Sequence, residues 1–343
     1  MPTAPASQLI EIACDESGAE GENLIGGETD VFAHASVSLS DVTATNCVQE
    51  IRELIGSPAQ EYKSNHLLRT KHRPVLEWLL GPNGPISGNA HVYLIDKTFF
   101  AVGKLTDLLV AQPPEPNLRP NPQAAALART LYRDGPGAFG RGRWAEFLES
   151  FTGLMRVRNR RGVPTSVDGF FRMVDTLRAA DAGTSTTALQ IMDRLWQARP
   201  RLEAFRAQLL DNPNMIPALD PLIPALAGTV AHWSAGERAV AIVHDQQTAL
   251  TDERVAELKE MFGRSVPQLR GRLRSLRLVD SRTDARVQVA DFLAGVARKI
   301  ASEELNDRGD VVLTGLLRPY VDALSIWGDD RSWLRLADTG RGG

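Results

Sequence analysis

The stretch Leu9–Gly18, with the sequence LIEIACDESG, decides how the chain is expected to fold. Its first six residues are mostly apolar, and such a short run is typical of a buried β-strand. The run ends on two carboxylates, Asp15 and Glu16, which are followed by Ser17 and Gly18, residue types typical of a turn. We therefore expect a core strand that carries acidic side chains near its carboxyl end.

Four further acidic residues stand in comparable surroundings. They are Asp96 and Asp245, which close apolar runs, Asp291 inside the amphipathic segment Val287–Ala297, and Glu61. An Asp after a strand often only caps the next helix or closes a turn. If several of these carboxylates share one buried rim, however, their charges must be neutralised. Hard divalent cations with oxygen ligands are the usual solution.

The composition is that of a soluble globular protein. The chain has 343 residues and a formal net charge of −3, so any binding of nucleic acid must rely on local basic patches. It has no apolar run of the roughly 18 residues that a membrane span requires. The N-terminus lacks a secretion pattern, and the two cysteines, Cys14 and Cys47, are typical of free thiols in a reducing compartment. We expect a cytoplasmic location.

The order of the expected elements indicates an α/β core interrupted by helices. After the first strand we expect an antiparallel partner and three later strands, at Val31–Leu39, Ala90–Asp96, Arg238–His244 and Leu273–Val279. Between Phe99 and about Trp233, helical periodicity and proline-rich breaks predominate. The predicted organisation is a core, a helical insertion and a tail packed on the core, at residues 1–100 plus 237–305, 101–236 and 306–343.

Several short motifs resemble those of the DUF3800 family. They are Asp15-Glu16-Ser17-Gly18, Glu61-Tyr62-Lys63, Ile95-Asp96-Lys97, and Asp280-Ser281 followed by Gln288-Val289-Ala290-Asp291-Phe292-Leu293-Ala294-Gly295. The resemblance covers roughly residues 8–100 and 238–302, and leaves out the insertion and the tail. The family is largely uncharacterised and is placed with the ribonuclease H-like superfamily. The resemblance therefore implies a ribonuclease H-like mixed sheet flanked by helices, here with a large helical insertion.

The resemblance also implies a set of metal ligands. Asp15 would be the first-strand ligand, Glu61 the acidic residue near the first helix, Asp96 the ligand after the fourth strand and Asp291 the late-helix ligand. Asp245 has no assured counterpart and competes with Asp96 for the third position. The cofactor would be Mg²⁺ or Mn²⁺. Two such ions, about 3.5–4 Å apart, can clamp the attacking and leaving oxygens of a phosphodiester.

Basic residues are the other part of the expected site. Lys63 or Lys97 could sit beside the carboxylates and assist phosphate binding. A run of arginines leads into the Asp291 segment, and its central members are Arg270, Arg272, Arg274 and Arg277. Such a run would bind backbone phosphates without reading base sequence. A run of charge is otherwise most often a solvated face.

The sequence thus predicts a metal-dependent nuclease that hydrolyses phosphodiester bonds. The alternative is a ribonuclease H-like scaffold that binds nucleic acid or a protein partner without cutting it. The residues do not separate DNA from RNA as substrate, or internal from terminal cleavage. They also leave open whether the chain forms a homo-oligomer or needs an activating protein partner, and whether the insertion shapes substrate access or self-association.

Overall fold

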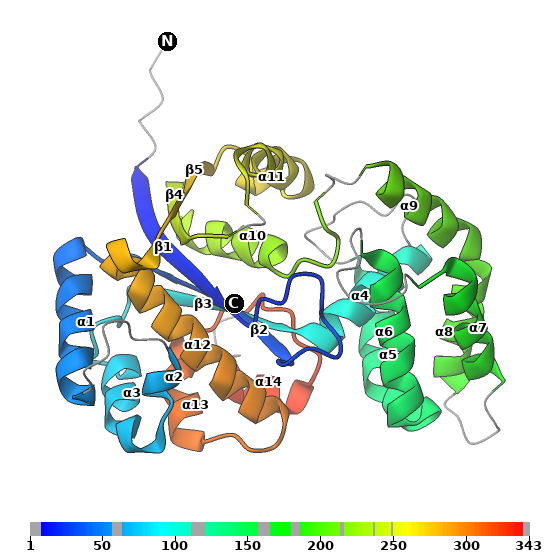
Figure 1. The fold of residues 1–343 in the computed structure, drawn as a ribbon, viewed down its shortest axis with the longest axis horizontal. Coiled ribbons are helices and arrows are strands. Elements are labelled where there is room, and N and C mark those ends of the chain that lie inside the picture. The colour runs from blue at the N-terminus through cyan, green and yellow to red at the C-terminus, as the bar shows by residue number, and fades with distance from the viewer. Residues whose placement is uncertain are drawn as a thin grey trace, which may run out of the picture.

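The computed structural model describes residues 8–56, 64–110, 121–156, 165–179, 186–212, 216–235, 237–247 and 250–338. Its centre is a five-stranded mixed sheet of order β3-β2-β1-β4-β5 (Figure 1). The strands are β1 (Leu9–Ser17), β2 (Val31–Val37), β3 (Ala90–Asp96), β4 (Ala239–Asp245) and β5 (Leu273–Val279). This is the ribonuclease H-like topology, so the predicted fold class is confirmed.

The register of the sheet fixes which strand ends lie together. β1 pairs antiparallel with β2, and β2 with β3, so the predicted antiparallel pair is confirmed. β1 pairs in parallel with β4, and β4 with β5. The carboxyl ends of β1, β4 and β5 therefore share one edge of the sheet. β3 lies two strands away from β1, at the outer edge.

One face of the sheet is covered by helices from both ends of the core. These are α1 (Asp41–Ile55), α2 (Ser64–Leu67), α3 (Arg73–Leu80), α12 (Ala285–Leu305), α13 (Val311–Leu317) and α14 (Asp330–Leu336). Helix α12 lies directly across β1 and β2 (Figure 1). Its buried residues, such as Val289 and Phe292, pack with Ala13 of β1 and Ala33 of β2 in one apolar cluster. Burial of this cluster holds α12 against the strand that carries the first acidic residues.

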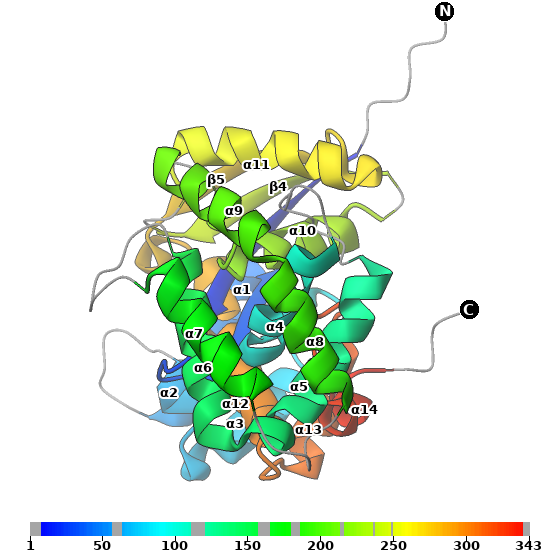
Figure 2. The same ribbon diagram turned by 90° about the vertical axis from the view of Figure 1, so that its right-hand side faces the viewer.

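A set of helices lies between β3 and β4 in the sequence, and its first and last members pack on the opposite face of the sheet. The set comprises α4 (Lys97–Val110), α5 (Pro122–Phe139), α6 (Arg141–Met155), α7 (Val167–Arg178), α8 (Thr186–Gln197), α9 (Arg199–Asp211) and α10 (Leu222–Trp233). The described residues of this segment contain no strand, which confirms the helical insertion. Figure 2 shows α5–α9 gathered on one side of the molecule, whereas α10 packs on β2 and β3. A further helix, α11 (Asp252–Ser265), connects β4 to β5.

The C-terminal segment runs along the outer edge of the sheet. Val321 and Ile326 form bridges to β3, and the Ile326 amide donates a hydrogen bond to the Leu94 carbonyl at 2.9 Å. Trp327 is buried, whereas Leu334, whose apolar side chain suggested packing, is 61% exposed.

The numerical limits of core, insertion and tail stay a prediction. None of the described helices has both the length and the apolar character needed to cross a membrane.

Candidate metal centre

Three carboxylates meet at the carboxyl ends of the parallel neighbours β1 and β4. Asp15 and Glu16 lie near the end of β1, and Asp245 is the last residue of β4. The pairing of the two strands runs up to Cys14 and His244, so Asp15 and Asp245 follow side by side. Because side chains alternate along a strand, Asp15 lies on the face covered by α12 and Glu16 on the face covered by α10.

Asp291 of α12 acts on the same group. Burial raises the pKa of Asp15 to about 9, together with the negative charges of Glu16, Asp291 and Asp245. The Glu16 amide opposes this rise, because it donates a hydrogen bond to Asp15 Oδ1 at 2.7 Å. The Asp15 residue is only 6% exposed. The four acidic residues, which we call the carboxylate group, therefore share one electrostatic environment with little screening by water.

Glu16 has a buried oxygen without a donor. Its Oε1 accepts a hydrogen bond from the Gln247 side-chain amide, whereas Oε2 has no hydrogen-bond partner. Oε2 lies 3.5 Å from His244 Nε2. Burial and the charges of Asp245 and Asp220 raise the pKa of Glu16 to about 8. Leaving such an oxygen unpaired is costly, so it is a favourable position for a cation.

Lys and Arg side chains do not pair with the strand-borne members of this group in the part of the chain that the structure describes. Among the described residues, no Lys or Arg nitrogen lies within 4.0 Å of the carboxylate oxygens of Asp15, Glu16 or Asp245. Asp245 is held instead by the Ser281 amide, which donates to Oδ1 at 3.0 Å. Carboxylate oxygens are the ligands that Mg²⁺ and Mn²⁺ prefer. The donor set therefore fits a hard divalent cation, with Asp15, Glu16, Asp245 and Asp291 as its available ligands.

Asp96 does not join the carboxylate group. It ends β3, the third strand, and not the fourth, which ends at Asp245. Its Oδ1 caps helix α4 by accepting a hydrogen bond from the Phe99 amide at 3.0 Å. Burial raises its pKa to about 6, against the opposing effect of Tyr132. Its Oδ2 has no hydrogen-bond partner, and in this it is like Glu16 Oε2. The carboxylate that raises the pKa of Asp96, however, is Asp30, which is not a member of the carboxylate group. Asp96 thus has the capping role that an Asp after a strand often has.

Two other expected site residues cannot be placed. Glu61 and Lys63 lie outside the described residues, and so their roles stay predictions. Helix α2 begins directly after them at Ser64 and packs against α12. The segment that contains Glu61 and Lys63 therefore leads into a helix next to the one that carries Asp291.

The four expected arginines are spread along the outer strand β5. Arg270 and Arg272 precede β5 at its amino end, which is opposite the carboxylate group. Arg274 is the second residue of β5, and Arg277 is the one nearest to the carboxyl end of the strand. Arg277 is about half exposed and lies 3.7 Å from Glu11 in an ion pair. Arg277 thus lies toward the carboxyl end of β5 with Glu11 as its ion-pair partner, and the binding of nucleic acid stays a prediction.

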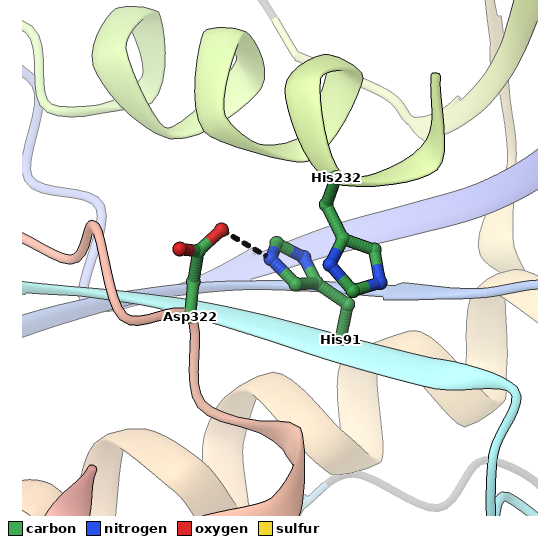
Figure 3. A group of neighbouring side chains, drawn as sticks. All are labelled: His91, His232 and Asp322. Atoms are coloured by element: carbon green, nitrogen blue, oxygen red, sulfur yellow. Dashed lines mark hydrogen bonds and ion pairs between the residues drawn. The ribbon is translucent and has the colours of Figure 1, made fainter. Parts of the chain in front are cut away.

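A second group of metal-binding residue types lies on the α10 face, at the start of β3 (Figure 3). His91 of β3, His232 in the last turn of α10 and Asp322 of the C-terminal segment place their ligand atoms within 4.8 Å of one another. His91 Nε2 and Asp322 Oδ2 are 2.7 Å apart, and the two imidazole rings stack with centroids 4.0 Å apart. Among the described residues, this is the one group of at least three that meets this distance.

The protonation of this histidine–aspartate group follows from its surroundings. The His232 residue is exposed overall, but desolvation of its imidazole and the neighbouring His91 lower the pKa of His232 to about 4. Burial alone would raise the pKa of Asp322, but the hydrogen bond and charge of His91 lower it overall. His232 is therefore neutral and Asp322 is ionised near neutral pH.

Helix α10 passes both groups. Asp220, just before its first residue, adds to the negative potential at Glu16. Thr229, further along, has its hydroxyl 2.9 Å from His34 Nδ1 of β2. His232 lies in the last turn. A row of polar side chains thus runs under this helix, in a layer that is otherwise apolar.

Two features of this region were not predicted from the sequence. Glu16 was not assigned as a ligand, although it directly follows Asp15, and that adjacency was the available signal. His91, His232 and Asp322 come from three distant segments and share no spacing pattern, so the sequence contained no signal for them.

The comparisons with known proteins do not extend this description. The chain matches no family model, no curated protein and no solved structure. The resemblance to the DUF3800 family stays a prediction, and the fold and the two side-chain groups are the observations on which function can be argued.

Proposed function

We propose that the chain is a metal-dependent nuclease that hydrolyses phosphodiester bonds at the carboxylate group. The observation that carries this proposal is the meeting of Asp15 and Asp245 at neighbouring strand ends, with Asp291 acting on Asp15 from α12. Among the described residues, no Lys or Arg forms an ion pair with Asp15 or Asp245. Mg²⁺ or Mn²⁺ would balance their negative charges, and when bound would stabilise charge on the transferring phosphoryl group.

The chain's own residues would hold the ions in fixed positions. The carboxylates of Asp15, Glu16 and Asp245 sit on paired strands, which limits their movement and so pre-organises the ligand oxygens. The three carboxylates do not place their ligand atoms within 4.8 Å of one another. Side-chain rotation would have to bring the ligand oxygens closer together when an ion binds.

The proposal includes membership of the DUF3800 family. Three of the residues in the resembling motifs, Asp15, Glu16 and Asp291, belong to the carboxylate group. A fourth, Gly295, lies one turn after Asp291 on α12, where a side chain would collide with Ser64 of α2. The late motif therefore has a physical reason for both its acidic residue and its glycine.

The substrate would approach the edge of the sheet where β1, β4 and β5 end. Arg277 and Arg282 are the partly exposed arginines nearest this edge, at 52% and 70% side-chain exposure. They also contact the carboxylates of Glu11 and Asp280. Phosphate binding by these arginines would have to compete with those contacts, so we propose a contribution to affinity and none to sequence specificity.

The test is cleavage of labelled single- and double-stranded DNA and RNA with Mg²⁺, Mn²⁺ or a chelator. Wild type would be compared with Asp15→Asn, Asp291→Asn and, as a matched control, Asp96→Asn. We expect metal-dependent cleavage that is lost in the first two variants and kept in the control. Cleavage that survives Asp15→Asn would contradict the proposed site.

A second outcome would favour the non-catalytic alternative. If wild type binds nucleic acid but never cuts it, and calorimetry detects no Mg²⁺ or Mn²⁺ binding that depends on Asp15, the nuclease proposal fails. The ribonuclease H-like sheet would then act as a binding scaffold.

A further inference from the structure

We infer that His91, His232 and Asp322 form a second metal site, selective for a divalent transition metal such as Zn²⁺. It is distinct from the carboxylate group in its residues and in its place in the fold. The three ligand atoms already lie within 4.8 Å of one another, and they come from β3, α10 and the C-terminal segment (Figure 3).

The donor set distinguishes this site chemically. Two imidazole nitrogens and one carboxylate oxygen suit Zn²⁺ and related transition metals, whereas Mg²⁺ prefers oxygen ligands alone. Zn²⁺ bound at about 2.0–2.1 Å would need these atoms roughly 3.3 Å apart, so His91 Nε2 and Asp322 Oδ2, now 2.7 Å apart, would separate slightly and the other two pairs would close by about 1.5 Å at most. Three protein ligands leave a fourth tetrahedral position for water. His232 is exposed, so water and the ion can reach that position.

The surroundings of His91 allow its ring to bind a metal. Its Nδ1 lies 3.4 Å from Ser36 Oγ, and that hydroxyl accepts a hydrogen bond from Trp233 Nε1 at 2.8 Å. In the metal-free protein, Nε2 carries the ring proton and donates it to Asp322. With a metal on Nε2, the proton would sit on Nδ1 and be donated to Ser36 Oγ. A hydroxyl serves either tautomer, because it both donates and accepts.

Asp322 is held in place from two directions. Its Oδ1 accepts a hydrogen bond from the Leu324 amide at 2.7 Å, and its own amide donates to the Val92 carbonyl at 2.8 Å. The Tyr93 hydroxyl donates to the Leu324 carbonyl at 2.7 Å. The segment around Asp322 therefore lies fixed on the edge strand β3. A metal there would join this segment and the end of α10 to β3, and so couple metal binding to the stability of the fold.

The experiment uses the full chain, freed of metal with a chelator and then titrated with Co²⁺ alone. We expect visible absorption from a nitrogen-ligated ion, loss of that absorption when Zn²⁺ is added, and no effect of Mg²⁺. His232→Ala should weaken Zn²⁺ binding by at least about tenfold, because even loss of a residue that only orients a metal ligand has an effect of that size. His232 is exposed in a last helical turn, so this variant should fold.

A control separates this site from the carboxylate group. Asp15→Asn should keep the Co²⁺ absorption and the rise in melting temperature with Zn²⁺, both of which His232→Ala should reduce. Equal Zn²⁺ affinity in wild type and His232→Ala would overturn the inference, as would binding that only Asp15→Asn removes. Because the readout is metal binding and not cleavage, the result does not depend on the nuclease proposal.

Discussion

The Nε2 atoms of His34 and His244 lie 3.3 Å apart across strand β1, in a fully buried layer. Only one of these two atoms can carry the shared proton. His244 Nδ1 lies 3.0 Å from the Asp245 carbonyl, which can only accept, so the His244 proton sits on Nδ1. His34 then donates from Nε2 and accepts at Nδ1 from the Thr229 hydroxyl. Neutral His244 has no second proton for Glu16 Oε2, which explains why that oxygen has no partner.

This histidine pair predicts a loss of stability in acid. Burial lowers the pKa of both His34 and His244 in the folded protein. Below the unfolded value of about 6.5, the unfolded chain therefore binds more protons, and stability falls as pH falls. His34→Gln should lower the free energy of unfolding at pH 7 by about 1–3 kcal/mol, because hydrogen bonds are lost. Between pH 6.5 and 4, however, the stability of this variant should fall less steeply than that of wild type. Urea unfolding at several pH values would measure this, and an unchanged slope would contradict it.

Asp15 predicts the opposite trend in the metal-free protein. Its pKa is raised to about 9 in the folded state, so the folded protein keeps a proton that the unfolded chain releases above about pH 4. Stability should therefore fall as pH rises from about 4 to about 9. Asp15→Asn should remove much of this fall and stabilise the metal-free protein at pH 8 by roughly 1–4 kcal/mol. Melting temperatures measured in the presence of a chelator at several pH values would test this prediction. A variant that is less stable than wild type at pH 8 would contradict it.

Glu16→Gln should separate charge from shape at the candidate centre. Gln keeps an oxygen for the Gln247 contact but cannot offer a negative ligand through the other atom. If the chain is a nuclease, we expect cleavage to fall roughly 10²–10³-fold, the loss typical of one stabilising group. Cleavage and Mn²⁺ affinity should be measured together. Full activity would place Glu16 outside the metal-binding set.

Asp96 should contribute to stability and not to cleavage. Asn caps a helix about as well as Asp, so Asp96→Asn should change stability little, whereas Asp96→Ala should cost about 0.5–2 kcal/mol. Both variants should keep wild-type cleavage per folded molecule. Loss of cleavage in Asp96→Asn with normal unfolding would instead restore Asp96 to the site.

Gly295 predicts a steric effect close to the candidate centre. A Cβ at this position would collide with the Ser64 side chain of α2, and overpacking costs about 1–3 kcal/mol. Gly103→Ala in α4 is the matched control, since a Cβ there meets no atom within 4 Å. We expect Gly295→Ala to lower stability relative to Gly103→Ala, which should gain up to about 1 kcal/mol from helix propensity. Equal stability of the two variants would argue against close packing of α2 on α12.

The sequence predicted the fold well because its strands have strong local signals. Apolar runs bounded by turn residues located β1, β3 and β4, and helical periodicity separated them from the insertion. The same signals could not choose between Asp96 and Asp245, since both end apolar runs. Strand order places Asp245 beside Asp15 and Asp96 two strands away, and that order depends on pairing between segments far apart in sequence.

The side-chain groups were only partly predictable for a similar reason. Asp15 and Asp291 stand out because a carboxylate in an apolar run is costly without a partner. Glu16 belongs to the opposite face of β1, so its role depends on what α10 brings to that face. His91, His232 and Asp322 converge only once the insertion and the C-terminal segment are both in place.

The position of α12 late in the chain also has a consequence during synthesis. Asp15 is made before the insertion, but Asp291 follows only after the whole insertion, and at roughly 5–20 residues per second the interval is on the order of tens of seconds. Throughout that interval a ribosome-bound chain has an incomplete carboxylate group. An enzyme that cuts nucleic acid would thus lack part of its candidate centre while this stretch is translated, which would protect the message and the ribosome that produce it.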